Sequence, residues 1–272
     1  MSILEVEGLC KTYPAFELRD VSFAVAPGTI MGFIGRNGAG KSTTIKAMLN
    51  LVHPDGGRVT MFGRDFYADE PACKQQLGVV LGGVDFYPNK KLRSITNVTR
   101  TFYDRWDENK YRHYLQLFAL DETKKVSQLS SGMRVKYMLA LALSHDARLL
   151  ILDEPTAGLD PAGRESILKN IRDYQAAQHA AVVMVSHSME EIASNVDRLI
   201  VMEKGTAVMT GAPSEVFSHA AELVSMGLNV PCMTQVLLRL QQLGVNVPAS
   251  AYTVEQAADI LEPLLKGGAR IC

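Results

Sequence analysis

A glycine-rich loop is the first feature with evident chemistry. Residues 35–42 read Gly-Arg-Asn-Gly-Ala-Gly-Lys-Ser, which matches the spacing G-x-x-x-x-G-K-[ST]. Glycines at this spacing let backbone N–H groups curl around phosphate oxygens, and the helix expected to follow points its positive end at the same anion. Lys41 is suited to neutralising the β- and γ-phosphates, and Ser42 to binding Mg²⁺. A plain glycine-rich turn is the alternative, but the loop lies between an expected strand and an expected helix, as phosphate binding requires.

Two adjacent carboxylates form the second candidate site. Residues 149–154 read Leu-Leu-Ile-Leu-Asp-Glu, so an apolar strand ends in Asp153 and Glu154. Ligands of α/β sheets bind at the carboxyl ends of the strands. Asp153 is suited to holding Mg²⁺, directly or through water, and Glu154 to polarising an attacking water. An acidic loop after a strand is the alternative, and the phosphate loop makes it the weaker one.

Two further polar features are ambiguous when each is taken alone. His187 follows the apolar run 181–185 and could hydrogen-bond a γ-phosphate or an attacking water, although a histidine at a strand end is more often structural. Ser130 and Gly132 precede a helical pattern that runs through Leu143. A Ser-Gly turn at a helix N-terminus offers a hydroxyl and N–H groups to an anion, but an ordinary helix cap has the same composition.

Taken together and in order, these motifs resemble the ATPase subunits of ABC transporters. Residues 35–43 are similar to Walker A, 149–154 to Walker B, 157–160 to the D-loop, and 129–133 to the LSGGQ signature. Ser131 and Met133 depart from that signature, and His187 resembles the switch histidine. Tyr13 stands where that family stacks an aromatic ring on adenine, with a strand-edge tyrosine as the alternative. The resemblance covers about residues 1–215.

The resemblance implies an ATPase that acts as a homodimer or as a heterodimer with another ABC ATPase. Each ATP would lie between the phosphate loop of one subunit and the signature of the other. Catalysis would then rest on Lys41, Glu154 and His187, and Mg²⁺ on Ser42 and Asp153. The residues expected to contact ATP are Tyr13, Gly35, Asn37, Gly38, Ala39, Gly40, Lys41, Ser42, Thr43, Ser130, Gly132 and Asp160. Dimer closure would push on transmembrane permease subunits, which places the chain peripherally on the cytoplasmic side of the cell membrane.

The chain departs from the family pattern where a glutamine is expected after the strand at 77–81. Gly82 and Gly83 occupy that place, while Gln75 and Gln76 precede the strand. Asp85 could substitute, although a surface loop acid is the alternative. The departure bears on coupling to the membrane partner and on catalytic efficiency.

Two branches of the family are represented along the chain. Residues 1–175 resemble ATPases of drug- or peptide-type exporters, especially at residues 126–133. The C-terminal part resembles energy-coupling-factor ATPases, at residues 186–191, 211–217 and 227–231. In that second group the tail helps the ATPases dimerise, and a helical lid with no partner role is the alternative.

The elements that must position these residues alternate between strand and helix. Strands are expected at 30–34, 59–62, 149–152 and 181–185, helices at 41–51 and 161–177, and a hairpin at 199–209. Such alternation predicts a mostly parallel sheet covered by helices. With the resemblance, the expected fold is an α/β P-loop NTPase (RecA-like), with N-terminal antiparallel strands. We expect an ATP-binding domain at 1–215, a helical subdomain at about 85–145 and a helical extension at 216–272.

Composition narrows the function classes. The 272 residues carry a formal net charge of -1, without the basic excess that is usual in general nucleic-acid binders, so no nucleic-acid partner is expected. The four cysteines form no CxxC pair, the N-terminus lacks the pattern of a signal peptide, and no apolar run has the length of a membrane span. One alternative is a soluble ABC ATPase acting on DNA or ribosomes, but such a protein would normally add coiled coils, zinc sites or a second cassette. The other is a P-loop kinase or GTPase, and the signature and D-loop argue against it.

Overall fold

A six-stranded sheet forms the centre of the molecule. The computed structural model describes residues 2–82 and 87–266. The strands of this sheet, in spatial order, are β10 (Thr206–Gly211), β9 (Arg198–Glu203), β3 (Ile30–Gly35), β8 (Ala181–Val185), β7 (Leu149–Asp153) and β6 (Leu77–Val80). All neighbours are parallel except β9 and β10, which form the expected hairpin. The carboxyl ends of five strands therefore meet at one edge.

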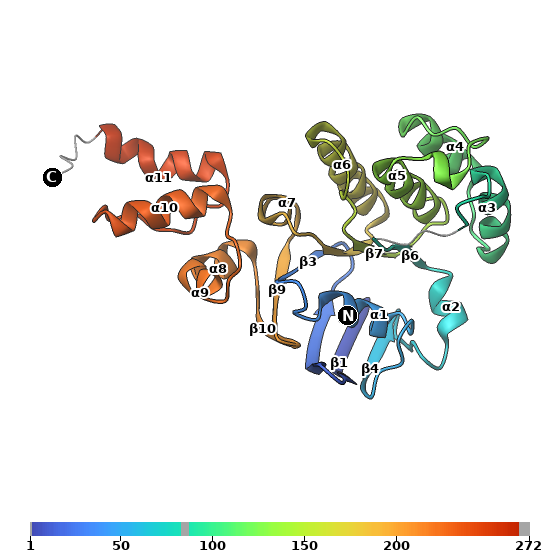
Figure 1. Ribbon diagram of the computed structural model, residues 1–272, viewed down its shortest axis with the longest axis horizontal. Helices are drawn as coiled ribbons and strands as arrows, with labels where there is room; N and C mark the ends of the chain where they lie inside the picture. The colour runs from blue at the N-terminus through green and yellow to red at the C-terminus, as the bar shows by residue number, and fades with distance from the viewer. Residues whose placement is uncertain (1, 83–86, 267–272) are drawn as a thin grey trace.

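The second sheet is antiparallel and packs below the first (Figure 1). Its order is β2 (Phe16–Val25), β1 (Leu4–Tyr13), β4 (Gly56–Met61) and β5 (Arg64–Asp65). Helix α1 (Lys41–Met48) shares one apolar core with both sheets. The helix expected to reach residue 51 ends earlier because Asn50 adopts a left-handed φ of 55°. Strand β4 begins at Gly56, before the strand that the sequence predicted at 59–62.

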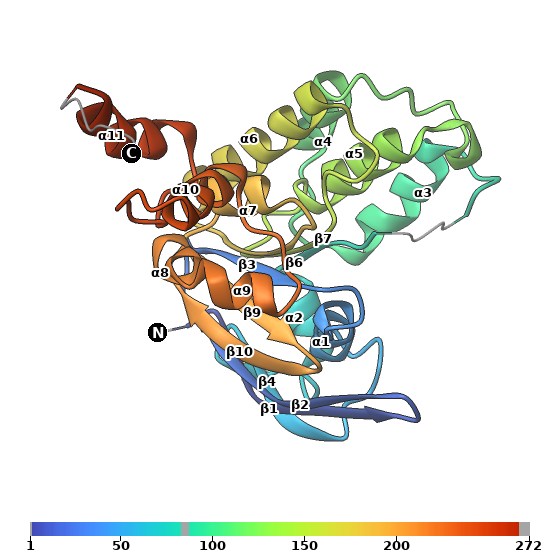
Figure 2. The same cartoon turned by 60° about the vertical axis from the view of Figure 1, so that its left-hand side comes forward.

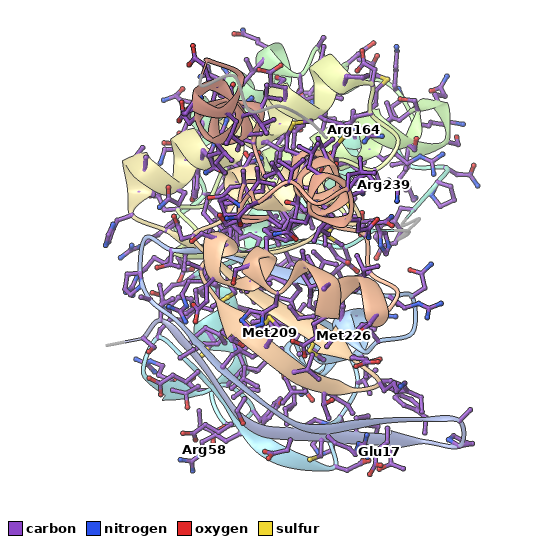
Figure 3. The ribbon with its side chains drawn as sticks, turned by 90° about the vertical axis from the view of Figure 1, so that its left-hand side faces the viewer. Glu17, Arg58, Arg164, Met209, Met226 and Arg239 are labelled. Carbon is purple, nitrogen blue, oxygen red and sulfur yellow. The ribbon has the colours of Figure 1, made fainter. Side chains whose placement is uncertain are left out.

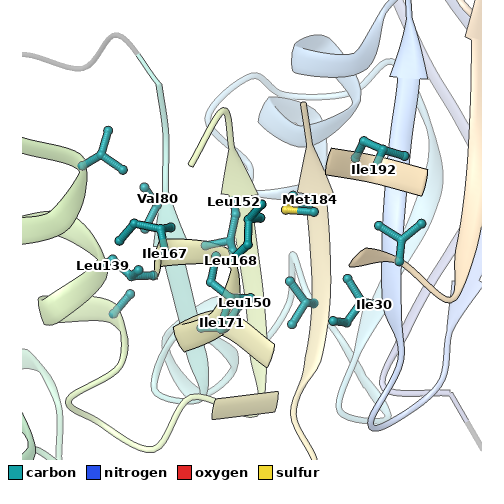
Figure 4. Close-up of a cluster of buried hydrophobic side chains, with 14 of the residues drawn as sticks. Ile30, Val80, Leu139, Leu150, Leu152, Ile167, Leu168, Ile171, Met184 and Ile192 are labelled. Atoms are coloured by element: carbon teal, nitrogen blue, oxygen red, sulfur yellow. The ribbon is translucent and has the colours of Figure 1, made fainter. Parts of the chain in front are cut away.

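The strands of the central sheet are apolar throughout because both faces are covered. In β7, Leu150 and Leu152 join the core under α6 (Pro161–Gln178), whereas Leu149 and Ile151 face the core that contains α1. Figure 4 shows the first of these cores, where the side chains of α6 meet those of β7 and β8. A strand buried on two faces needs an uninterrupted apolar run, as the sequence has.

The helical insert lies between β6 and β7 in the chain. It comprises α3 (Leu92–Thr99), the 3₁₀ turn Arg100–Phe102, α4 (Glu108–Leu117), the 3₁₀ turn Val126–Gln128 and α5 (Ser131–Ala142). A buried polar group holds it together, because Thr96 Oγ1 lies 2.7 Å from Tyr111 Oη and 2.9 Å from Tyr137 Oη. The short helix α2 (Glu70–Lys74) precedes β6. Helices α3, α4 and α5 of the insert lie together with α6 on one side of the central sheet (Figure 1).

The C-terminal helices fall into two groups (Figure 2). Helices α8 (Pro213–Ser218) and α9 (Ala220–Ser225) insert Phe217 and Leu223 into the main core. Helices α10 (Cys232–Gln242) and α11 (Val254–Lys266) share a separate small core built on Leu237 and Val247. The separate core thus begins after about residue 230. The boundary at 215 between the ATP-binding domain and the helical extension stays a prediction. Among the described residues, no helix is long and apolar enough to cross a membrane.

Candidate functional site

The phosphate loop connects β3 to α1 and holds Lys41 inward. Gly40 has a φ of 111°, and a Cβ at this position would lie 3.1 Å from Leu18. Lys41 is only 6% exposed, and its Nζ donates hydrogen bonds to the carbonyl oxygens of Gly35 (2.6 Å) and Arg36 (3.1 Å). The ammonium is therefore held by its own loop, within reach of an anion.

Burial lowers the pKa of Lys41, and the nearby carboxylates of Glu154 and Asp153 oppose that shift. Burial likewise raises the pKa of Asp153, while Lys41 and the Ser42 hydroxyl act in the opposite direction. The lysine and the two carboxylates thus form one electrostatic unit at the carboxyl edge of the sheet.

Glu154 has the properties of a proton acceptor. Its backbone adopts a left-handed φ of 54°, and its N–H donates to Val185 O (3.0 Å), which ties β7 to the end of β8. Burial, and then the charge of Asp153, raises the pKa of Glu154 to about 7. His187 Nε2 lies 3.3 Å from Glu154 Oε1, but without hydrogen-bond alignment. Among the described residues, this buried oxygen has no hydrogen-bond partner, so it is available to a water.

These residues surround one cavity of about 580 Å³. Of the residues that the sequence predicted, the cavity brings together Asn37, Gly38, Ala39, Gly40, Lys41, Ser42, Thr43, Asp153, Glu154 and His187. Gly82 and Ala157, from the expected glutamine position and the D-loop, also line it, together with Ala15, Phe16 and Val185, to which the sequence pointed in no way. Tyr13 is not among the lining residues; its ring centroid lies 6.4 Å from that of Phe16, its partner across the β1–β2 hairpin.

The signature residues lie outside this cavity and pack on the loop after β7. Ser130 caps α5 by accepting a hydrogen bond from Met133 N at 3.2 Å. Gly132 is buried so tightly that a Cβ there would collide with Leu159 Cδ2. Asp160 caps α6 through Gly163 N at 3.1 Å. Within one chain these three residues are structural caps and close contacts, set apart from Lys41.

Glu191 connects the loops that carry the catalytic candidates. Its carboxylate accepts hydrogen bonds from Thr156 Oγ1 (2.8 Å) and Ser186 Oγ (3.0 Å) and lies 3.6 Å from the Arg164 guanidinium. It therefore fixes the loop after Glu154 to the loop before His187. Spacing along the sequence does not reveal this role, because the contacts join elements that are distant in sequence.

Gly82 stands where a glutamine was expected, and the structure places it against the two carboxylates. A Cβ at Gly82 would lie 3.2 Å from Asp153 O and 3.5 Å from Glu154 Cβ. Gln75 instead ties the insert to the sheet, donating to Phe102 O and accepting from Asp104 N. The other candidate for this role, Asp85, lies outside the described residues.

Comparisons with known proteins agree with this geometry. The family described as ABC transporter matches residues 18–157. The chain belongs to this family. It is an ATP-binding subunit of an ABC-type transporter, and an ABC ATPase with the α/β P-loop fold predicted from its sequence.

Two similar proteins are both described as energy-coupling factor transporter ATP-binding proteins. An energy-coupling factor transporter ATP-binding protein of Symbiobacterium thermophilum is 34% identical over 92% of this chain and 90% of its own length. Its namesake in Caldanaerobacter subterraneus is 32% identical over 94% of this chain and 93% of its own length. The likeness predicted for the tail therefore extends over nearly the whole ABC ATPase.

Two solved structures share the fold. The structure of an ATP-binding subunit of an ABC transporter superposes with a TM-score of 0.74 at 25% identity, and covers 88% of this chain and 100% of that one. A nucleotide-free ATP-binding cassette gives a TM-score of 0.71 at 22% identity, over 84% of this chain and 100% of that one. The second likeness is one of fold alone.

Proposed function

We propose that this ABC ATPase powers an energy-coupling-factor type transporter, and that it hydrolyses ATP as a dimer at the cavity described above. The observation that carries the proposal is the convergence of Lys41, Asp153, Glu154 and His187 on one cavity at the carboxyl edge of the sheet. The energy-coupling factor proteins at 32% and 34% identity support the kind of transporter.

Each residue around the cavity takes a separate role in this proposal. Lys41 leaves its loop carbonyls to neutralise the β- and γ-phosphates, which the backbone N–H groups of residues 37–43 surround. Glu154 accepts a proton from the attacking water through its unpartnered oxygen, and His187 donates to the γ-phosphate. Near pH 7 about half of the Glu154 carboxyls carry no proton, so acceptance is possible at neutral pH.

Ser42 and Asp153 are the candidate ligands for Mg²⁺. Both line the cavity, and their oxygen atoms suit a hard cation that takes one or two protein ligands and completes its shell with waters and phosphates. Among the described residues, no group of three or more His, Cys, Asp or Glu side chains is arranged so that it could hold a metal ion by itself. When bound, Mg²⁺ would neutralise charge on the β- and γ-phosphate oxygens.

The proposed dimer completes the site. Ser130 and Gly132 lie outside the cavity of their own chain, so we infer that they close over the ATP of a partner subunit, either a second copy or another ABC ATPase. Asp160 would lie at the same junction. The tail helices are proposed to strengthen this pairing, and a transmembrane permease to receive the motion of closure at the cytoplasmic face of the membrane.

Direct measurement of ATP binding and turnover tests the proposal. Lys41→Ala should weaken ATP binding by about 10- to 100-fold, since charge-assisted hydrogen bonds to phosphate are lost. Glu154→Gln should bind ATP but lower kcat by about 10²-fold or more, because only the proton acceptor is removed. Lys169→Ala, on the surface of α6, is the matched control. Unchanged affinity in the first variant or unchanged kcat in the second would contradict the assignment.

A further inference from the structure

Two contacts join the C-terminal helices to the nucleotide site. We propose that residues 225–232, which link α9 to α10, couple α10 and α11 to both ATP-contacting loops, through Arg36 of the phosphate loop and through Glu190 beside His187. The inference deepens the proposed function, because it rests on the cavity being the ATP site, and it assigns Glu190 as a positioning residue.

The first contact joins Gly227 to Arg36 of the phosphate loop. Gly227 has a φ of 73°, and a Cβ at this position would lie 3.0 Å from Arg36 Nη1 and 3.3 Å from its Cδ, so the Arg36 side chain lies across the glycine. Residues 36–39 also line a cavity of about 310 Å³ with Met226 and Leu228. Arg36 O also accepts a hydrogen bond from Lys41 Nζ. The residue that contacts Gly227 is therefore hydrogen-bonded directly to the phosphate-binding lysine.

Met226 precedes Gly227 and shows where this contact lies in the molecule. Figure 3 views the molecule from the side of the C-terminal helices, with Met226 and Met209 labelled. Both methionines pack against the main core, which continues into Leu228 and Val230. The linking segment is therefore fixed to the body of the ABC ATPase on both sides of Gly227.

The second contact lies at the start of α10. Pro231 is the N-cap residue of this helix and provides no side-chain acceptor. Glu190 of α7 (Met189–Asn195) supplies one instead, since Cys232 N donates to Glu190 Oε1 at 3.2 Å. Glu190 follows His187 by three residues and belongs to the first turn of α7, which Ser188 caps. Movement of α10 thus acts on the segment that carries His187.

The separate core of α10 and α11 lets the two helices act as one unit in this coupling. Leu237, Val247 and Ala257 are buried against one another, so the two helices move as one body. Displacement of that body, for example on pairing with another subunit, shifts both contacts together. By linkage, ATP at the phosphate loop must in turn favour one position of the helices. A tail that only pairs subunits would act on ATP through the amount of dimer, and substitutions at the Arg36 and Glu190 contacts would then leave ATP affinity and turnover unchanged.

Matched asparagine substitutions test the contact to Arg36. Gly227 and Gly244 both follow a helix end with positive φ, of 73° and 86°, and asparagine tolerates this conformation. A Cβ at Gly244 meets nothing within 4 Å. We expect Gly227→Asn to raise the Kd for ATP about three- to tenfold and Gly244→Asn to leave it unchanged. Equilibrium dialysis of the full chain with ATP in Mg²⁺-free buffer, where ATP is not consumed, gives the comparison, and thermal unfolding of both variants checks their folding.

A second pair of variants tests Glu190. Glu190→Ala removes the acceptor for Cys232 N and should lower kcat about threefold with little change in KM, since the site that binds ATP is intact. Glu190→Gln keeps an acceptor oxygen and should restore kcat. Glu222→Ala, on the exposed side of α9, is the control. A merely structural role would lower the unfolding temperature without this separation of kcat from KM.

The proposal is overturned if Gly227→Asn binds ATP as tightly as Gly244→Asn, or if Glu190→Ala turns over ATP at the wild-type rate. The dialysis measurement requires neither a membrane partner nor turnover. A chain that binds ATP but joins no transporter would therefore contradict the proposed function and leave the test of this coupling valid.

Discussion

Glu154 is the residue on which the proposed chemistry depends most. Its positive φ and the hydrogen bond from its N–H to Val185 O hold the carboxyl at the cavity, and burial raises its pKa to about 7. A carboxyl with an ordinary pKa would be a poorer proton acceptor at neutral pH. The fold thus both positions Glu154 and raises its pKa.

The pH dependence of turnover follows from that pKa. Below about pH 7 Glu154 holds a proton in the free enzyme and has no capacity to accept another, so kcat/KM should rise with pH and level off above pH 7. Steady-state ATPase assays measure this profile. His187→Gln serves as the control, because an inflection caused by Glu154 should persist in that variant at reduced rate. A flat profile for the wild-type chain from about pH 6 to pH 8 would contradict the role of Glu154.

At this scale the sequence predicted the local motifs well and the long-range contacts poorly. The phosphate loop and residues 149–154 are contiguous, so their spacing alone indicates which atoms face a ligand, and the structure brings them to one cavity. Phe16 and Gly82 reach it only because strands pair and parallel strands end at the same edge. The spacing of residues along the sequence shows neither which strands pair nor which residues, such as Glu191, hold several loops together. The ATP-contacting roles of Tyr13 and Gly35 stay predictions.

The junction between the helical insert and the sheet contains an unusual histidine. His145 is 1% exposed, stacks on Tyr103 with ring centroids 3.7 Å apart, and has no hydrogen-bond partner for either ring nitrogen among the described residues. Burial lowers its pKa to about 4. The folded chain therefore requires the neutral imidazole.

Acid should destabilise the chain through His145. A histidine whose pKa is lower in the folded state than its unfolded value of about 6.5 favours folding at higher pH, and this contribution is lost as the pH falls from about 6.5 toward 4. Against His145→Phe, which keeps the stack on Tyr103, the wild-type chain should lose about 3 kcal/mol across that range. Urea unfolding at several pH values measures the difference. Parallel stability curves for the two proteins would contradict it.

Helices α10 and α11 should be separable from the rest. Their own core is distinct from the main one, against which Leu238 and Tyr252 also pack, whereas α8 and α9 bury Phe217 inside the main core. A chain ending at Val230 should keep its thermal unfolding transition within a few degrees but self-associate less, because the proposed pairing surface is removed. Light scattering of the ATP-bound Glu154→Gln chain, with and without residues 231–272, tests this expectation. Equal dimerisation of the two chains would leave the tail as a lid.

Element boundaries illustrate what sequence periodicity can and cannot predict. The strands at 149–153 and 181–185 and the helix at 161–178 are close to their predicted ranges, because an apolar run covered on both faces has one structural solution. The end of α1 and the start of β4 were misplaced, since both depend on the backbone conformation of single residues, Asn50 and Gly57, with φ values of 55° and 95°.

At the scale of the whole molecule, the order of the motifs was more informative than any one of them. Ser130 and Gly132 read alone as a helix cap, and the structure shows them capping and packing within their own chain. Their proposed role at ATP needs a second subunit, which no single chain displays. The same holds for the proposed membrane partner.

The most direct test of the account is to identify what the ABC ATPase binds in its native cell. Tagged Glu154→Gln chain, expected to be trapped with ATP, would be recovered from mildly solubilised membranes, and the co-purifying proteins identified by mass spectrometry. Tagged Lys41→Ala chain, which should not close on ATP, is the control. We expect a multi-span membrane scaffold together with a small substrate-binding membrane protein. Recovery of ribosomes or DNA-repair proteins, without any membrane-spanning protein, would contradict it.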